Sequence, residues 1–306
     1  MRVGYGLAAL AATLWAINAS MASSLMDRGL GWAPLSQLRV AGAFAILLVG
    51  LAIVRRDQLR VERRQVRELA FLGVFALAPV QATYFLAIDR LQIGVALTIQ
   101  YLAPLIVLVW LRLWLGRRIA SGLWGAVALS AAGCFLVVRA YDASSLDALG
   151  VLVAFASAFT FAGYMVGSER AGRDHSPFTT LVYGFGFASL AWAVAQPWWN
   201  FPFDELSAPR DALLALGVVV LGTLFPFLAM VAALRHIPTP RAGIVATLEP
   251  VLAALFAWVL VDESLVALQV GGMALVVVAV AWVQGHRPDL EAEAAPGALD
   301  QRSKPA

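Results

Sequence analysis

Long runs without charge set the strongest limit on what this chain can fold into. Its 306 residues are 61% hydrophobic and only 13% charged, and the mean hydropathy is +0.80. The charges gather in short clusters between apolar stretches of roughly twenty residues, the length that crosses about 30 Å of hydrocarbon. A soluble domain carries charge on roughly a quarter of its residues. The sequence therefore predicts an integral membrane protein and excludes a soluble fold.

The charge-poor runs predict ten membrane spans. Since the pattern lacks the alternation of barrel strands, the spans must be helices, which satisfy their own backbone hydrogen bonds in lipid. The expected spans are about residues 5–25, 34–54, 69–88, 91–111, 121–138, 148–167, 177–198, 212–234, 242–261 and 266–284. The first run could be a cleaved signal peptide, but it is longer than a usual signal core, so we expect it to remain as a span. The polar residues 286–306 are predicted to be a disordered cytoplasmic tail.

Arginine is divided unevenly between alternate loops. With the N-terminus inside, the inner loops contain Arg55, Arg56, Arg60, Arg63, Arg64, Arg67, Arg112, Arg117, Arg118, Arg170, Arg173, Arg235 and Arg241, and the outer loops Arg28, Arg90, Arg139 and Arg210. Cytoplasmic loops are typically rich in Arg and Lys. We therefore expect a multi-pass protein of the bacterial inner membrane with both termini in the cytoplasm. The same loops explain the net charge of +3 without a nucleic-acid partner.

The two halves of the chain resemble each other. The segment Ala96–Pro104 aligns with Ala242–Pro250, and the same offset places Gly125 on Gly271. An odd number of spans in each half turns the second half upside down relative to the first. We therefore expect an all-α fold of two inverted five-helix repeats, at 1–142 and 143–285, around a central cavity. This arrangement is typical of secondary transporters, although gene duplication without transport is an alternative.

Several motifs together carry a family resemblance. The repeat, with Gly222-Thr223, Leu248-Glu249-Pro250-Val251 and Asp262-Glu263-Ser264-Leu265, resembles the EamA branch of the drug/metabolite transporter superfamily. The stretch from Pro226 to Pro250 loosely resembles the threonine/homoserine exporter group. The first half departs from the family pattern, because Gly116-Arg117-Arg118 stands where the family usually has Gly-Glu. The resemblance implies a ten-helix bundle, a cavity lined by spans 1, 3, 4, 6, 8 and 9, and export of amino acids or related metabolites.

Two charged residues lie inside expected spans, where they must face protein or a water-filled cavity. Glu249 in the ninth span could bind a substrate ammonium group or carry a coupling proton. Alternatively, it is a structural carboxyl group hydrogen-bonded to a neighbouring helix. Arg39 in the second span could attract a substrate carboxylate, or it could extend towards the outer interface or pair with a helix end.

A set of polar and aromatic side chains near mid-span could line a pocket for a small amphipathic metabolite. The set comprises Trp15, Asn18, Gln81, Tyr84, Gln100 and Tyr164. Two pairs within it are three residues apart and so share a helix face. The alternative for each residue is ordinary packing or a hydrogen bond between helices. Pro104 and Pro250 occupy matched positions in the repeat, and matched helix breaks point to a transport site or to structural kinks.

Other kinds of chemistry find no support in the sequence. The three histidines, His175, His236 and His286, are too far apart to suggest a metal site, and no Walker motif is present. We therefore expect no metal and no cofactor. A membrane-embedded lipid-modifying enzyme would need clustered Asp, His or Lys at a membrane face, and only the arginine-rich loop at 55–68 approaches that.

The sequence thus predicts a secondary transporter rather than an enzyme. It would export small metabolites, in first place amino acids or related compounds, by alternating access. Its partners would be a small-molecule substrate and the lipid bilayer, and either the substrate gradient or proton exchange would drive it. Export of drug-like or toxic compounds is the alternative, and a non-transporting scaffold is the rival from another class.

Overall fold

The structure is a computed structural model of the chain that describes residues 1–142, 147–261 and 264–285. The tail expected at 286–306 lies outside these described residues. So do Asp262 and Glu263 of the Asp-Glu-Ser-Leu motif.

The described part of the chain is helical and contains no strand. Its first half comprises α1 (Arg2–Asp27), α2 (Trp32–Val54), α3 (Arg63–Leu72), η2 (Gly73–Leu77), α4 (Ala78–Arg90), α5 (Ile93–Gln100), α6 (Ala103–Leu113) and α7 (Ser121–Val137). Its second half comprises α8 (Ala148–Ala171), α9 (Pro177–Ala195), α10 (Pro209–Val219), η6 (Val220–Leu224), α11 (Phe225–Leu234), α12 (Thr239–Ala246), α13 (Leu248–Val261) and α14 (Ala267–Gly285). Short 3-10 turns lie in the loops.

Each of the ten expected spans corresponds to an apolar helical stretch. Nine helical stretches of the described residues are long and apolar enough to cross a membrane, and α7 is a shorter apolar helix. Several of these stretches combine two or three of the helices above. For example, the stretch Arg63–Arg90 comprises α3, η2 and α4. This third span begins earlier than expected, at Arg63, because Glu62 and Gln65 form a capping box that supports polar turns before the apolar run.

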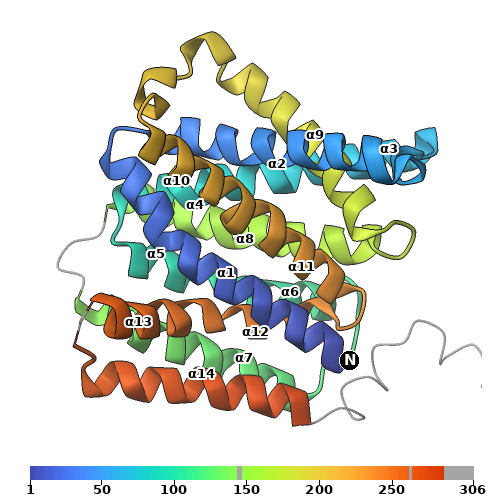
Figure 1. The fold of residues 1–306 in the computed structure, drawn as a ribbon. Helices are drawn as coiled ribbons and strands as arrows, with labels where there is room; N and C mark the ends of the chain where they lie inside the picture. The colour runs from blue at the N-terminus through green and yellow to red at the C-terminus, as the bar shows by residue number, and fades with distance from the viewer. Residues whose placement is uncertain (143–146, 262–263, 286–306) are drawn as a thin grey trace, which may run out of the picture.

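The helices form a bundle in which the two repeats enclose a shared interior. Figure 1 shows α7 and α14 packed together on one side, with α2, α3 and α9 on the opposite side and α1 and α11 crossing between them. The backbones of α7 and α14 approach closely at Gly133 and Gly272. A Cβ on Gly272 would lie 2.7 Å from the Gly133 carbonyl oxygen. Small residues at such crossings are a common way to pack membrane helices.

The fourth and ninth spans are each broken near the middle. α5 and α6 are separated at Tyr101 and Leu102, and α12 and α13 are separated at Thr247. Tyr101 and Thr247 are related by the same offset as Pro104 and Pro250. Proline has no N–H, so the carbonyl four residues earlier loses its helical partner. Each break thus begins three residues before one of the two matched prolines.

The third and eighth spans each contain a π-helical turn, which the sequence analysis did not anticipate. The turns are η2 and η6, and each is followed by a proline, Pro79 or Pro226, at the second residue of the next helix. The first residues of the two turns, Gly73 and Val220, are therefore equivalent positions in the two repeats. The similar triplets Leu72-Gly-Val and Leu216-Gly-Val would instead suggest an alignment shifted by a few residues. π-Helical turns inside helices frequently mark functional sites.

The contact between α7 and α14 gives a direct test of the packing. We predict that Gly272→Leu lowers the free energy of unfolding by about 1–3 kcal/mol, because the new side chain meets the α7 backbone. The matched control is Gly271→Leu, since a Cβ on Gly271 meets no atom within 4 Å. Thermal unfolding of the purified protein in detergent measures both, and equal melting temperatures would contradict the packing.

Candidate functional site

A small cavity lies within the bundle beside the breaks in the fourth and ninth spans. Its volume is about 40 Å³. It is lined by Trp15, Asn18, Arg39, Val80, Gln81, Tyr84, Gln100, Tyr101, Phe161, Phe227 and Glu249. These residues come from spans 1, 3, 4, 6, 8 and 9, as the family resemblance implied, and Arg39 is added from the second span. The structure thus brings seven of the eight proposed binding residues together.

Tyr164 is the proposed binding residue that does not line this cavity. Its side chain is fully buried, and its ring packs against Phe161 and Phe227 with centroids 5.9 and 5.0 Å away. Both phenylalanines line the cavity themselves. Tyr164 therefore supports the wall from behind.

Arg39 is buried and holds the π-helical turn of the eighth span. Its Nη2 donates to the carbonyl oxygen of Gly222 at 2.7 Å, and its Nε donates to Oγ1 of Thr223 at 2.8 Å. Pro226, four residues after Gly222, has no N–H to offer that carbonyl. Arg39 therefore supplies the donor that the proline removes, and its guanidinium also lies 4.8 Å from the centre of the Phe85 ring.

One arm of the Arg39 guanidinium stays unused. Nη1 is buried and has no hydrogen-bond partner in the described part of the chain. Because Arg39 lines the cavity, this nitrogen is a charged donor available to a molecule bound there. Arg39 can therefore hold the eighth span through Nε and Nη2 and still offer Nη1 to a bound molecule.

Asn18 lies directly against the same π-helical turn. A Cβ on Gly222 would come within 1.8 Å of Asn18 Oδ1, so only glycine at position 222 leaves room for the amide. Asn18 Oδ1 has no hydrogen-bond partner among the described residues. The Gly222-Thr223 motif thus has two local functions: it admits Asn18 and it anchors Arg39.

Glu249 lies in the first turn of α13, just after the break in the ninth span. Its Oε2 accepts a hydrogen bond of 2.5 Å from the hydroxyl of Tyr101, at the break in the fourth span. A carboxylate near a helix N-terminus is also favoured by the helix dipole. The two broken spans, one from each repeat, therefore meet through this hydrogen bond.

The remaining wall is aromatic, with uncharged amides set into it. Trp15 packs edge-on against Phe161 and Phe227, with ring centroids 6.0 and 5.6 Å apart. Gln81 Nε2 and Gln100 Oε1 are buried without hydrogen-bond partners in the described residues. A buried polar group left unpaired costs about 1–3 kcal/mol. Several such groups around one cavity are expected where a ligand supplies the partners.

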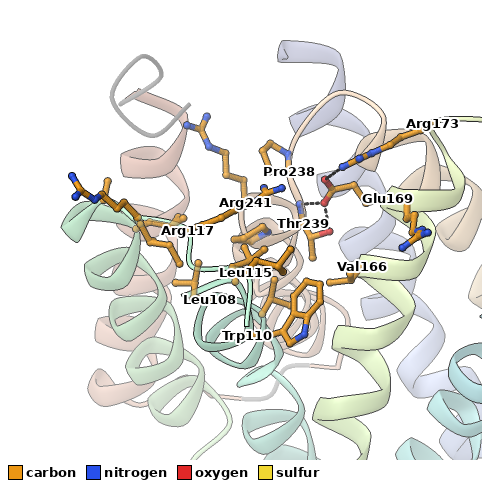
Figure 2. A pocket seen from close by; sticks show the side chains of 18 of the residues that line it. Leu108, Trp110, Leu115, Arg117, Val166, Glu169, Arg173, Pro238, Thr239 and Arg241 are labelled. Carbon is orange, nitrogen blue, oxygen red and sulfur yellow. Dashed lines mark hydrogen bonds and ion pairs between the residues drawn. The ribbon is translucent and has the colours of Figure 1, made fainter. Parts of the chain in front are cut away.

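A second, larger space opens at the arginine-rich end of the bundle, with a volume of about 500 Å³. Figure 2 shows Glu169 of α8 reaching Thr239 at the start of α12. Its Oε2 accepts from the Thr239 N–H at 2.8 Å and from Thr239 Oγ1 at 2.5 Å. This space, called the vestibule below, is lined by residues of α6 and α12, and Pro104 at the start of α6 packs against α12. A Cβ on Gly243 would lie only 2.8 Å from that proline ring, so glycine permits the close contact.

Two regions of the chain, residues 2–139 and 148–284, match the model of the EamA-like transporter family. Together they span most of the sequence. The chain belongs to the EamA-like transporter family. It is therefore a multi-pass membrane transporter of the drug/metabolite superfamily, and not an enzyme.

Curated relatives agree with membership of the EamA-like family, and a solved structure shares the fold. The chain is 29% identical over 270 residues to the threonine/homoserine exporter RhtA of Escherichia coli (strain K12), covering 86% of this chain and 84% of the relative. It is also 29% identical over 241 residues to an uncharacterized transporter of Archaeoglobus fulgidus, covering 78% of this chain and 85% of the relative. A solved crystal structure matches with a TM-score of 0.75 over 91% of this chain and 95% of that chain, at 18% identity. That likeness shows the shared fold.

Sequence reasoning missed four lining residues, Val80, Tyr101, Phe161 and Phe227. A signal was available for Tyr101, because it precedes Pro104 by three residues and corresponds to Thr247 in the repeat. The pair Pro79 and Pro226 could likewise have indicated the π-helical turns. Apolar residues such as Phe161 carry no comparable signal, because most of the chain is equally apolar.

The attachment of Arg39 gives a testable consequence for stability. Thr223→Val keeps the shape of the side chain but removes the acceptor for Arg39 Nε. We therefore predict a loss of about 1–3 kcal/mol in the free energy of unfolding. Thr180→Val is the matched control, because the Thr180 hydroxyl is buried without a hydrogen-bond partner in the described chain. Thermal unfolding in detergent should rank the two, and an equal or smaller loss in Thr223→Val would contradict the anchoring.

Proposed function

We propose that this transporter exports a small zwitterionic metabolite, in first place an amino acid, and that the central cavity is its binding site. One observation carries the proposal. Arg39 and Glu249 are opposite in charge and line the same buried cavity, yet no ion pair joins them within the described chain. The α-carboxylate of an amino acid would accept from Arg39 Nη1, and its ammonium group would donate to Glu249.

The rest of the cavity suits a small neutral side chain that can hydrogen-bond. Asn18, Gln81 and Gln100 present unpaired polar atoms, while Trp15 and Phe227 supply an apolar surface. RhtA is named for threonine and homoserine, which are both zwitterions with a hydroxyl group. The same chemistry fits the groups around this cavity, so we place hydroxylated amino acids first.

A cavity of about 40 Å³ holds little more than one or two water molecules, so substrate must enter through a wider conformation. Support for such a change comes from the irregular turns at matched positions in both repeats, which divide four spans into shorter segments. We infer that the substrate enters from the vestibule when the contact of Pro104 with Gly243 opens. It would leave on the opposite side after the two repeats exchange conformations.

The arginine-rich end with the vestibule would then face the cytoplasm, with both termini on that side of a bacterial inner membrane. The two functional halves would be residues 1–142 and 143–285. Glu249 would bind the substrate ammonium group, and in a proton-driven cycle it would also hold the exchanged proton between substrate cycles. The alternative driving force is the gradient of the substrate itself.

Counterflow in proteoliposomes tests the proposal. Vesicles loaded with unlabelled candidate amino acids should accumulate the same labelled amino acid, with threonine and homoserine among the fastest. The methyl ester, which lacks the carboxylate, and the N-acetyl derivative, which lacks the ammonium group, should give little exchange. Equal exchange of these derivatives, or exchange of uncharged drug-like compounds alone, would refute it. Repeating the assay with an imposed pH difference decides between the two driving forces.

Substitution of the two charged residues gives the corresponding prediction for flux. Arg39→Lys and Glu249→Gln should each lower the initial counterflow rate at least tenfold, because each loses a charge-assisted hydrogen bond of about 1.5–3 kcal/mol. Arg90→Lys and Glu205→Gln are matched controls, since both residues are exposed and neither lines the cavity. Wild-type rates in Arg39→Lys and Glu249→Gln would contradict the proposed roles.

A further inference from the structure

A groove on the outside of the bundle lies beside the vestibule and is distinct from the central cavity. It is enclosed by α3, α6 and α8 and has a volume of about 980 Å³. Both α3 and α6 pack on α8, as the contacts between these helices and their arrangement in Figure 1 show. The groove is thus a recess in the surface that a membrane transporter turns towards lipid.

The walls of the groove are apolar and strongly exposed. Phe71, Leu113 and Phe159 line it with 66%, 69% and 60% of their surface exposed. Its depth comes from Gly163 on α8, where a Cβ would meet no atom within 4 Å. A hydrocarbon chain fits these walls, and every CH₂ group that it buries there strengthens its binding.

The end of the groove that the arginine pattern assigns to the cytoplasm is positively charged. Arg67 and Arg170 line it there together with Glu68, so these three side chains carry a net charge of +1. Arg67 forms no ion pair within the described part of the chain, and Arg170 has only a long, exposed contact of 3.9 Å with Glu68. Trp114, 75% exposed just beyond the end of α6, also lines the groove, as expected of an aromatic residue at the membrane interface.

We propose that this groove binds one anionic glycerophospholipid of the inner leaflet. An acyl chain lies against Gly163 and Phe159, and the phosphate accepts hydrogen bonds from Arg67 and Arg170. Charge complementarity decides the occupant. A zwitterionic lipid would bring its own cation to a site already rich in arginine, whereas an anionic headgroup adds only negative charge.

The bound lipid would have a function in transport because the groove and the vestibule share a wall. Trp110 and Val166, both labelled in Figure 2, line both spaces, as does Val107. A chain seated in the groove closes the vestibule laterally against the bilayer. It also supports α6, which is the cytoplasmic half of the broken fourth span. This role extends the protein's contacts with the membrane and does not depend on which metabolite is exported.

Native mass spectrometry of the detergent-purified protein tests the site. Delipidated protein is titrated with dioleoyl phosphatidylglycerol and, separately, with dioleoyl phosphatidylcholine. We expect one phosphatidylglycerol adduct that binds at least tenfold more tightly than phosphatidylcholine. Dihexanoyl phosphatidylglycerol has the headgroup without the long chains, and it should bind far more weakly. Equal affinity for the two dioleoyl lipids, or equal binding of the short-chain lipid, would overturn the proposal.

Two variants with matched controls locate the adduct. Gly163→Leu fills the groove and should abolish the tight adduct, whereas Gly271→Leu, at an open position on α14, should retain it. Arg67→Gln should weaken the adduct about fivefold, since one arginine near an anionic surface contributes about 1 kcal/mol. Arg63→Gln removes a charge from the same helix outside the groove and should leave affinity unchanged. If Gly163→Leu keeps the adduct but stops counterflow, the groove is a substrate route and the lipid site is refuted.

Discussion

An arginine in a membrane-spanning helix is costly, by about 2.5–3.5 kcal/mol on insertion scales, unless protein groups surround its charge. Hydrogen bonds to the eighth span offset this cost for Arg39. The π-helical turn at Val220–Leu224 and the proline after it leave the Gly222 carbonyl without its usual helical donor, and Arg39 supplies one. Thr223 Oγ1 accepts from the same guanidinium and donates to the Val218 carbonyl at 3.1 Å. The irregular turn and the buried charge therefore stabilise each other.

The attachment of Arg39 to the π-helical turn fixes the geometry of the cavity. Because two nitrogens of Arg39 are bound to the eighth span, the third is held where a ligand can reach it. Gly222, which accepts from Arg39, also admits Asn18 from the first span. On the other side, the Tyr101–Glu249 hydrogen bond links the two broken spans. The cavity thus depends on the breaks of the fourth and ninth spans and on the π-helical turn of the eighth span, so a change in any of these three would alter the site.

The sequence predicts the fold well because its strongest signals are physical requirements of the bilayer. Apolar runs must be long enough to cross the bilayer, and arginines must lie mostly in the loops on one side of it. The spans expected from these two requirements agree with the helices of the structure within a few residues at most ends. The broken spans were predictable for a similar reason, since Pro104 and Pro250 must each leave a carbonyl unpaired. Isolated polar residues in apolar helices, such as Gln81 and Gln100, indicated the cavity because they must avoid lipid.

The parts that could not be predicted depend on contacts between distant segments. Nothing local to Arg39 shows that its partner is the Gly222 carbonyl, because 183 residues separate the two. Tyr164 has the same polar character as Tyr101, and only packing places one behind the wall and the other inside it. The groove between α3, α6 and α8 is equally hidden in the sequence, since its residues are ordinary lipid-facing ones until three helices bring them together.

We propose above that Arg39 recognises the carboxylate of a zwitterionic substrate in the cavity. The most direct measurement is the affinity of wild-type protein and of Arg39→Gln for threonine and for threonine methyl ester, by isothermal titration calorimetry in detergent. We expect the substitution to weaken threonine binding at least tenfold and to leave the already weak binding of the ester almost unchanged. An equal loss of affinity for both compounds would contradict it, because Arg39 would then act only by holding the helix.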